Sequence, residues 1–231
     1  MKKFWKEVSI AEVEGGWQVT LDGRGIKTQR GAAQVVPTQE AAELLAEEWR
    51  AQGDEIDTKV FVFRDLADFA IDMVRPDIGG TVDKLLSYAD TDTLCYRASP
   101  DEPLYQRQEE VWEPLVTAFE KRHGARMERV SGVVHRGHPE ATMAALRDRL
   151  VGEDDFTLSA LITLASLAAS IVVALAILDE DGDTSTMFAA ANVEEDWQAE
   201  LWGWDAEAER TRKLQLEAFE KAAQFAKAVR D

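Results

Sequence analysis

The chain has 231 residues, 45% of them hydrophobic and 30% charged, and its 44 acidic and 26 basic side chains give a net charge of −18. This length allows one large domain or two small ones, each with a buried core. The acidic excess argues against binding to nucleic acid or to an anionic membrane, because neutralising phosphates requires clustered lysine and arginine. The single cysteine, Cys95, excludes an internal disulfide framework and fits a reducing compartment.

Residues 1–16 have neither the continuous apolar stretch of a secretory signal nor the arginine-rich, acid-poor composition of a mitochondrial presequence. We therefore expect a bacterial cytoplasmic protein. The mature form of an organellar protein, located in the mitochondrial matrix, is the alternative that the same observation allows.

The segment 8–36 is predicted to form short strands. Trp17, Val19 and Leu21 alternate with polar neighbours, and glycine-containing breaks on either side carry turn chemistry. This pattern predicts a β-meander or a small barrel.

Helical signals begin after this β-region. Thr38 is a suitable N-cap for a helix that ends before Gly53, and a second helical period runs from Leu66 to Met73 and closes at Pro76. We expect an extended piece over residues 60–63 between the two. The fold class is therefore α+β: a small mixed, mainly β amino-terminal domain over residues 1–76 and a larger all-helical carboxy-terminal domain over residues 77–231.

Three features organise the second domain. One apolar stripe runs along a helix from Ile78 to Tyr96, and another follows residues 111–119 through Val111, Leu115 and Phe119. A connecting loop over residues 123–140 has room for a short strand at residues 133–134. The chain ends in a long amphipathic helix, whose apolar side is predicted to carry Leu214, Ala218, Phe225 and Val229.

Residues 156–178 contain no ionisable side chain, so either lipid or the protein interior must cover them. Acidic residues flank the run on both sides, whereas a spanning helix usually has lysine or arginine on its cytoplasmic side and tryptophan or tyrosine at the interfaces. We therefore expect a buried central helix, or two short helices broken near Ser170. A membrane anchor is the less favoured alternative.

Signals for catalysis or metal binding are weak. No glycine-rich phosphate loop is present, and the acidic stretch from Asp179 to Asp183 does not fit an EF-hand. His135 and His138 lie close in sequence but lack an obvious third ligand, and a pairing of Cys95 with His123 has almost no specificity. The runner-up function is a small-molecule enzyme that uses carboxylates and His123 in a cleft between the two domains.

Two clusters are rich in residues that anchor protein contacts. The first is SYADTDTLCYR, residues 87–97, where a helix would place Asp92 among apolar groups and oblige it to find a hydrogen-bond partner. The second is VEEDWQAELWGWDAEAE, residues 193–209, where Trp197, Trp202 and Trp204 surround Gly203. Tryptophan is favoured at binding hot spots and in folded cores alike, so composition leaves both roles open.

Taken with GGWQVTLDGR at 15–24, EEWRAQGDEID at 47–57 and ASIVVALAIL at 169–178, these clusters resemble the Atp12 family of F1 ATP synthase assembly chaperones. The order and spacing match across nearly the whole chain. The resemblance implies a protein that binds the newly made α subunit of F1, shields the surface later buried against β, and releases it as the α3β3 ring forms. It implies no cofactor and no covalent chemistry, and it implies the same two-part fold.

The resemblance also implies where the partner binds. The two segments supply the following residues: Gln198, Trp202, Gly203, Asp205 and Glu207 from one, and Tyr88, Thr91, Asp92, Cys95, Tyr96 and Arg97 from the other. This chain departs from the family pattern at Ala168 and Ala169, where a glycine is expected before Ser170, and at Trp204 with Asp205. We expect a monomer that exposes an apolar patch rimmed by charge, because free α subunits would otherwise aggregate.

Overall fold

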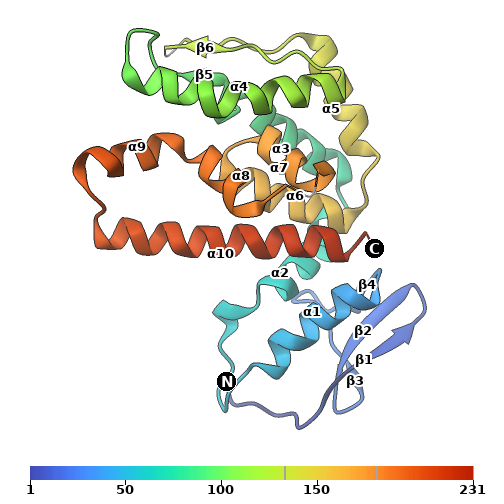
Figure 1. Ribbon diagram of the computed structural model, residues 1–231. Helices are drawn as coiled ribbons and strands as arrows, with labels where there is room; N and C mark the ends of the chain where they lie inside the picture. Colours follow the sequence, from blue (N-terminus) through green and yellow to red (C-terminus); the bar gives the residue numbers. More distant parts are fainter. Residues whose placement is uncertain (133, 181, 231) are drawn as a thin grey trace. The chain divides into compact units, whose positions relative to one another are not determined.

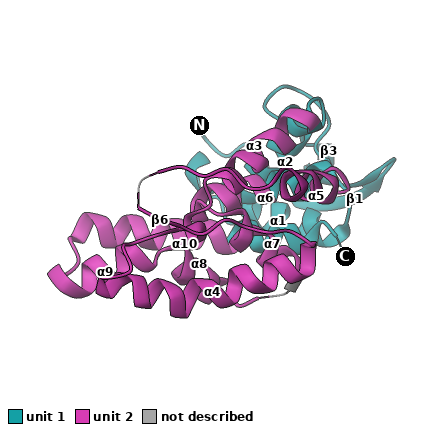
Figure 2. Ribbon diagram, turned by 90° about the horizontal axis from the view of Figure 1, so that it is seen from above, with its two compact units in different colours: residues 1–78, 154–160, 221–231 teal, residues 79–153, 161–220 magenta. Residues whose placement is uncertain are grey.

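The computed structural model describes residues 1–132, 134–180 and 182–230 (Figure 1). Within it the chain forms two compact units, coloured separately in Figure 2. Unit 1 comprises residues 1–78, 154–160 and 221–231, and unit 2 comprises residues 79–153 and 161–220. The fold class α+β is confirmed, and the domain boundary after residue 76 stays a prediction.

Unit 1 contains a small antiparallel sheet and the first helices. Its strands are β1 (Val8–Val13), β2 (Gly16–Leu21), β3 (Arg24–Gly25) and β4 (Val35–Val36), and β2 pairs with each of the other three. The meander predicted from residues 8–36 is therefore confirmed. Gly16 has φ +146°, and a Cβ there would lie 2.2 Å from the Val36 carbonyl oxygen, so only glycine allows β2 and β4 to approach.

Helix α1 (Gln39–Arg50) follows the sheet and confirms the helix predicted from residue 38. The Thr38 hydroxyl accepts the backbone N–H of Ala41 at 3.0 Å, as an N-cap does, and it donates to the Ala228 carbonyl at 2.5 Å. The buried face of α1 is formed by small and aliphatic side chains: Ala41, Ala42, Leu44, Leu45 and Ala46.

The extended piece predicted over residues 60–63 is wrong. A 3₁₀ turn (Thr58–Val60) leads directly into α2 (Val62–Phe69), which continues as a π-helical turn (Ala70–Val74). The Glu48 carboxylate of α1 accepts the N–H groups of Val62, Phe63 and Arg64 at 2.7, 2.8 and 3.0 Å. Burial raises the pKa of Glu48, and these three backbone hydrogen bonds oppose that shift. A carboxylate from another helix therefore satisfies the free N–H groups that would otherwise disfavour a helix start there.

The uncharged run forms two short helices, which is the second of the two arrangements expected from the sequence. Helix α6 (Asp155–Ala168) ends at Ala169, which has φ +46°, and α7 (Ile171–Glu180) begins after Ser170. Aliphatic side chains of the run are buried in the protein, among them Leu161, Leu164, Ile171, Val173 and Leu175. Across the described ranges, no helix combines the length and the apolar character needed to cross a membrane.

The remaining elements of unit 2 are helical except for one short ladder. They are α3 (Ile78–Asp90), a 3₁₀ turn (Thr93–Cys95), β5 (Tyr96–Arg97), α4 (Pro103–His123), β6 (Val130–Ser131), α5 (Glu140–Val151), α8 (Thr184–Ala191), α9 (Val193–Trp202) and α10 (Ala206–Ala228), the last continuing into unit 1. The strands β5 and β6 are parallel, with Tyr96 opposite Val130 and Arg97 opposite Ser131.

Several predictions about unit 2 need correction. The helical stripe does not reach Tyr96, because α3 ends at Asp90 and Asp92 turns the chain into β5. The short strand lies at 130–131; of the predicted positions, residue 133 lies outside the described residues and Val134 is not in a strand.

The predicted buried faces of two helices also shift. The buried side of α4 is formed by Trp112, Val116 and Phe119, with Val111 and Leu115 only half-buried. Leu214, predicted on the apolar side of the last helix, is 56% exposed.

Candidate functional site

The first cluster is organised around the carboxylate of Asp92, which is fully buried. Its Oδ1 accepts the N–H of Leu94 at 3.0 Å, and its Oδ2 accepts the Ser170 hydroxyl at 2.9 Å and the N–H of Val172 at 3.0 Å. The hydrogen-bond partners that the sequence required for Asp92 are thus Leu94 in its own segment and Ser170 and Val172 at the start of α7. This carboxylate stabilises the start of α7 through the free N–H groups and the positive end of the helix dipole.

The environment of Asp92 also shifts its titration. Burial raises the pKa of Asp92 to about 6, and the hydrogen bonds from Val172, Ser170 and Leu94 oppose the shift. The N–H of Thr93 donates to the carbonyl of Ala169 at 3.0 Å, so the strained residue between α6 and α7 is bound to the same segment. Asp92 therefore connects two parts of unit 2 that are far apart in sequence.

Arg97 is the second buried charge in this cluster. Its guanidinium donates to Glu109 and, at 2.7 Å, to Glu113, both on α4. Arg129 donates to Glu113 from Nη2 at 2.8 Å and also to Glu120, so the residue before β6 joins the same network. Burial opposes ionisation of Glu113, but the hydrogen bonds from Arg129 and Arg97 lower its pKa to about 2. The network fastens the β5–β6 ladder to α4.

The other residues of this segment divide by exposure. Cys95 is buried, and burial raises the pKa of its thiol, which disfavours the reactive thiolate. Tyr88 and Tyr96 are half-buried, and Thr91 is exposed. The structure therefore leaves Tyr88, Thr91 and Tyr96 with accessible surface, whereas the predicted contact residues Asp92 and Arg97 are buried and hold the segment in place.

The second cluster forms the junction of α9 and α10. Gly203 ends α9 with φ +83°, a value that favours glycine, and its N–H bonds to the Ala199 carbonyl at 2.8 Å. The Asp205 carboxylate then accepts the N–H of Glu207 at 2.6 Å and so caps α10. Arg212 contacts Asp196 at 3.0 Å and Glu195 at 3.4 Å, which holds the first turns of α10 beside α9 (Figure 1).

Large apolar side chains lie open to solvent at this junction. Trp202 is 77% exposed, Leu201 57% and Trp204 42%, and Leu214 of α10 is also exposed. Gln198, Gly203, Asp205 and Glu207, the other predicted contact residues, are all exposed as well. We call the surface made of Leu201, Trp202 and Trp204 the apolar junction surface, whereas Leu214 lies further along α10. Exposed apolar groups that share a rim of charge mark interaction sites more often than scattered ones do.

Sequence reasoning missed one member of this surface, because Leu201 was not singled out. It also placed Leu214 on the apolar side of the last helix, where the structure leaves that side chain exposed. The helical period places Leu214 on the side of Ala218 and Phe225, but the period alone does not show where the covering structure ends. The signal that was available is the neighbouring Trp-Gly-Trp sequence, which concentrates bulky side chains around a helix break.

Other residues considered for chemistry have structural contacts. His138 accepts the N–H of Glu128 at 2.9 Å and contacts the Ala89 carbonyl at 2.8 Å, while His135 lies 3.2 Å from Asp90. His123 lies 3.5 Å from Asp179 and against the Phe119 ring. In the part of the chain that the structure describes, no three histidine, cysteine or acidic residues gather as metal ligands. The acidic stretch after α7 includes residue 181, which lies outside the described residues.

Comparison with known proteins shows the family of this chain. A family model described as ATP12 chaperone protein matches residues 2–120, which is more than half of the chain. The chain belongs to the ATP12 chaperone family. The resemblance seen in the sequence is therefore confirmed, and with it a chaperone of F1 ATP synthase assembly.

Relatives of known structure share the fold over most of their length. Atp12 from Paracoccus denitrificans is 32% identical, with a TM-score of 0.92 and coverage of 99% of this chain and 98% of that one. An aspartate-to-lysine mutant of the same protein matches equally well, with a TM-score of 0.92. The Atu1473 protein of Agrobacterium tumefaciens is 34% identical, with a TM-score of 0.94 and coverage of 98% of this chain and 85% of that one.

A more distant relative comes from a eukaryote. Protein atp12, mitochondrial, of Schizosaccharomyces pombe is 26% identical over 216 residues, which cover 87% of this chain and 74% of that protein. Atp12 proteins of bacterial and mitochondrial origin thus align with most of this chain.

Proposed function

We propose that this protein binds the unassembled α subunit of F1 ATP synthase and shields its β-facing surface until the α3β3 ring forms. The apolar junction surface is the contact site in this proposal. Its apolar side chains cover apolar surface of the client, and the acidic rim keeps the complex dispersed. Binding and release involve no cofactor.

The exposure of Trp202 is the observation that carries the proposal. An indole with more than three-quarters of its surface in water contributes little to the fold, whereas in an interface it provides a large apolar area and one N–H donor. Leu201 lies beside it at the end of α9. The two side chains together form the centre of the proposed contact.

The remaining predicted residues have different roles in this proposal. Gly203 and Asp205 shape the junction, the first through its positive φ and the second through its cap on α10. Gln198 and Glu207 form the polar rim, and Tyr88 and Tyr96 offer a second contact area in unit 2. Asp92 and Arg97 act indirectly, by holding the segment that carries Tyr96.

Substitution of Trp202 tests the contact. Trp202→Ala should weaken capture of isolated F1 α by about 2 kcal/mol, roughly 30-fold in Kd, as loss of a central aromatic anchor does. Glu207→Ala should give a smaller loss, because rim charges mainly change association rates. The measurements are pull-down of F1 α and light scattering of F1 α diluted from denaturant, with circular dichroism as the check on folding.

A pair of aliphatic side chains with equal exposure provides the control. Leu201 and Val151 are both 57% exposed in unit 2, but Val151 ends α5 and is not part of the junction. Leu201→Ala should weaken capture, and Val151→Ala should leave it unchanged. Equal capture by Trp202→Ala, Leu201→Ala and the unmodified protein would show that the site is elsewhere.

The proposal extends to the state and location of the protein. We propose that it works as a monomer in the bacterial cytoplasm, or in the mitochondrial matrix if it is the mature form of an organellar protein. The alternative of an enzyme built on His123 has less support, because His123 is mostly buried against Phe119 and Asp179 and the family is one of chaperones.

A further inference from the structure

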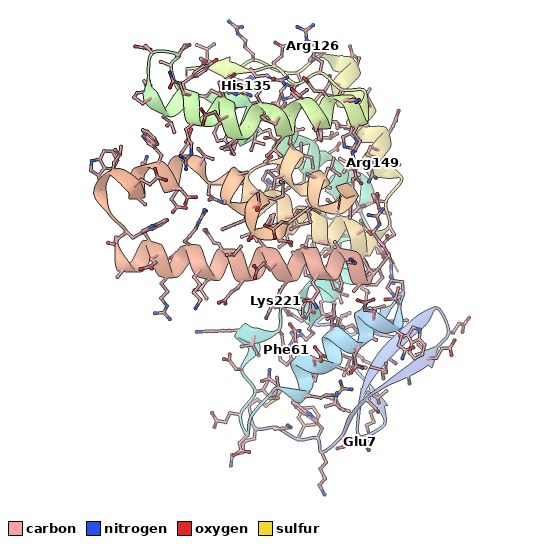
Figure 3. All side chains as sticks on the ribbon, in the orientation of Figure 1. Glu7, Phe61, Arg126, His135, Arg149 and Lys221 are labelled. Atoms are coloured by element: carbon pink, nitrogen blue, oxygen red, sulfur yellow. The ribbon has the colours of Figure 1, made fainter. Side chains whose placement is uncertain are left out.

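A cavity of about 390 Å³ lies in unit 2 where the first cluster meets the start of α9. Its lining is formed by Thr91, Thr93, Tyr96, His135 and Glu194; His135 is labelled in Figure 3. Thr91 and Tyr96 belong to the segment that is typical of the family, but the stability of that segment depends on Asp92 and Arg97 instead. The accessible side chains of the segment are therefore available for another role.

The walls of the cavity combine aromatic faces with negative charge. The rings of Tyr96 and His135 are nearly parallel, at 23°, with centroids 6.5 Å apart. Nε2 of His135 lies 3.2 Å from Oδ2 of Asp90. Glu194 contributes a carboxylate from the first turn of α9.

The Glu194 carboxylate is held in place from one side only. Its Oε1 accepts a hydrogen bond from Nε2 of Gln108 at 2.7 Å, and the amide oxygen of Gln108 is fixed by the N–H of Ala98 at 2.8 Å. Gln108 is fully buried, so its amide cannot turn away. Partial burial raises the pKa of Glu194, while the bond from Gln108 opposes the shift. Glu194 is exposed, so its other carboxylate oxygen is open to solvent and accessible to a cation.

We propose that this cavity receives an arginine side chain of the client, with the guanidinium donating to Glu194 and stacking on Tyr96. A planar guanidinium suits this lining because it offers several N–H donors in one plane and an apolar face for an aromatic ring. A lysine ammonium would reach the carboxylate but would lose the stacking. The inference rests on the proposed function, since it names a feature of the client that the same unit recognises.

The position of the cavity also restricts the client segment. Glu194 and Trp202 are eight residues apart on α9, which corresponds to about 12 Å along the helix axis. An extended chain advances about 3.3 Å per residue, so about four residues of an extended client segment cover this distance. The client segment should therefore carry its arginine at least about four residues from the apolar side chain that meets Trp202, since the two positions also differ in direction around the helix.

An experiment without the client tests the cavity directly. Acetyl-arginine methylamide is titrated into the full-length protein, and the backbone amide shifts are followed by NMR. Shifts should concentrate at Thr91, Thr93, Tyr96 and Glu194, and the citrulline analogue, which has the same shape without the charge, should produce none there. Shifts spread evenly over the acidic surface, or equal shifts with citrulline, would overturn the proposal.

Substitutions separate the carboxylate from the ring. Glu194→Gln keeps the length of the side chain and an acceptor for Gln108, and it should weaken arginine binding at least fivefold. Glu195→Gln is the matched control, because Glu195 is on the same turn but faces Arg212, and it should leave binding unchanged. Tyr96→Leu should weaken binding while Tyr96→Phe retains it; unchanged binding in both Glu194→Gln and Tyr96→Leu would overturn the proposal.

The same variants distinguish failure of the cavity from failure of the proposed function. If F1 α is captured and neither Glu194→Gln nor Tyr96→Leu reduces capture, the arginine cavity is wrong and the apolar junction surface stands. If arginine binds as described but F1 α is not captured by the unmodified protein, the α-subunit function is wrong. Reduced capture by Glu194→Gln with normal capture by Glu195→Gln supports both.

Discussion

The segment from Asp92 to Arg97 lies mostly inside unit 2, whereas the segment from Leu201 to Glu207 lies at its surface. Both are aromatic and acidic, and both belong to the pattern that is typical of the ATP12 family. In the first, the charges of Asp92 and Arg97 find partners on other elements, namely α7 and α4. In the second, Trp202 and Glu207 remain open to solvent. Similar composition therefore supports the fold in one segment and leaves a surface free in the other.

Removal of the Asp92 carboxylate should give the largest effect on stability. Asp92→Ala would leave the N–H groups of Val172 and Leu94 and the Ser170 hydroxyl without their acceptor in a fully buried site. Each unpaired buried group costs about 1–3 kcal/mol, so we expect a loss of about 4 kcal/mol in the free energy of unfolding, measured with urea. Asp83→Ala removes an exposed carboxylate on the neighbouring helix and should change it by less than about 0.5 kcal/mol.

The pH dependence of stability should show the cost of ionising Asp92. Its pKa is raised from 3.8 to about 6 in the folded protein, so its stabilising contribution is complete below pH 3.8 and is lost as pH rises to about 6. We therefore expect the free energy of unfolding, relative to Asp92→Asn, to fall by about 3 kcal/mol between these pH values. Urea unfolding of both proteins at several pH values checks this. A constant difference between the two proteins would contradict the assignment.

A glycine at the break between α6 and α7 should increase the stability of the protein, whereas the loss of Asp92 decreases it. Ala169 has φ +46°, where a Cβ costs about 1–2 kcal/mol, and its side chain is exposed. Ala169→Gly removes this strain but increases the freedom of the unfolded chain, so we expect a net gain of about 0.5–1 kcal/mol. Ala168→Gly, within helix α6, should instead lose about 1 kcal/mol. Thermal unfolding of the two variants compares them, and a loss in both would show that residue 169 is not strained.

Trp202→Ala should have the smallest effect on stability. Because most of the indole is already in water, we expect a change of less than about 0.5 kcal/mol in the free energy of unfolding, together with the loss of client capture described above. Loss of client capture with little change in stability distinguishes a contact surface from a segment that supports the fold. A large loss of stability would show that Trp202 supports the fold, as Asp92 does.

Local patterns were sufficient for much of the fold. The alternation at Trp17, Val19 and Leu21 predicted the meander, and Thr38 predicted the start of α1. The uncharged run predicted either one buried helix or two short helices broken near Ser170, and the structure has the two helices. These features depend on residues close together in sequence, where periodicity and capping act directly. The family pattern leads one to expect a glycine before Ser170, and Ala169 at that place has a positive φ, which glycine favours.

Long-range contacts explain where prediction from the pattern was wrong. Residues 60–63 read as extended, but Glu48 caps α2 there from another helix. The helix after Ile78 appeared to continue to Tyr96, but Asp92 bonds to Ser170 and Val172 and the chain turns into β5 instead. In the site, the indoles of the Trp-Gly-Trp sequence were compatible with core and with interface, and their exposure shows that they are not core residues.

The sequence by itself determined the family, the fold class and the residues from which a contact surface could be chosen, because composition, periodicity and motif order are properties of the chain. Only the tertiary structure decided that Asp92 and Arg97 are internal, that Trp202 and Leu214 are exposed, and that Tyr96 and Glu194 line one cavity. Burial and hydrogen-bond partners depend on which distant segments meet, and a linear pattern does not contain that information.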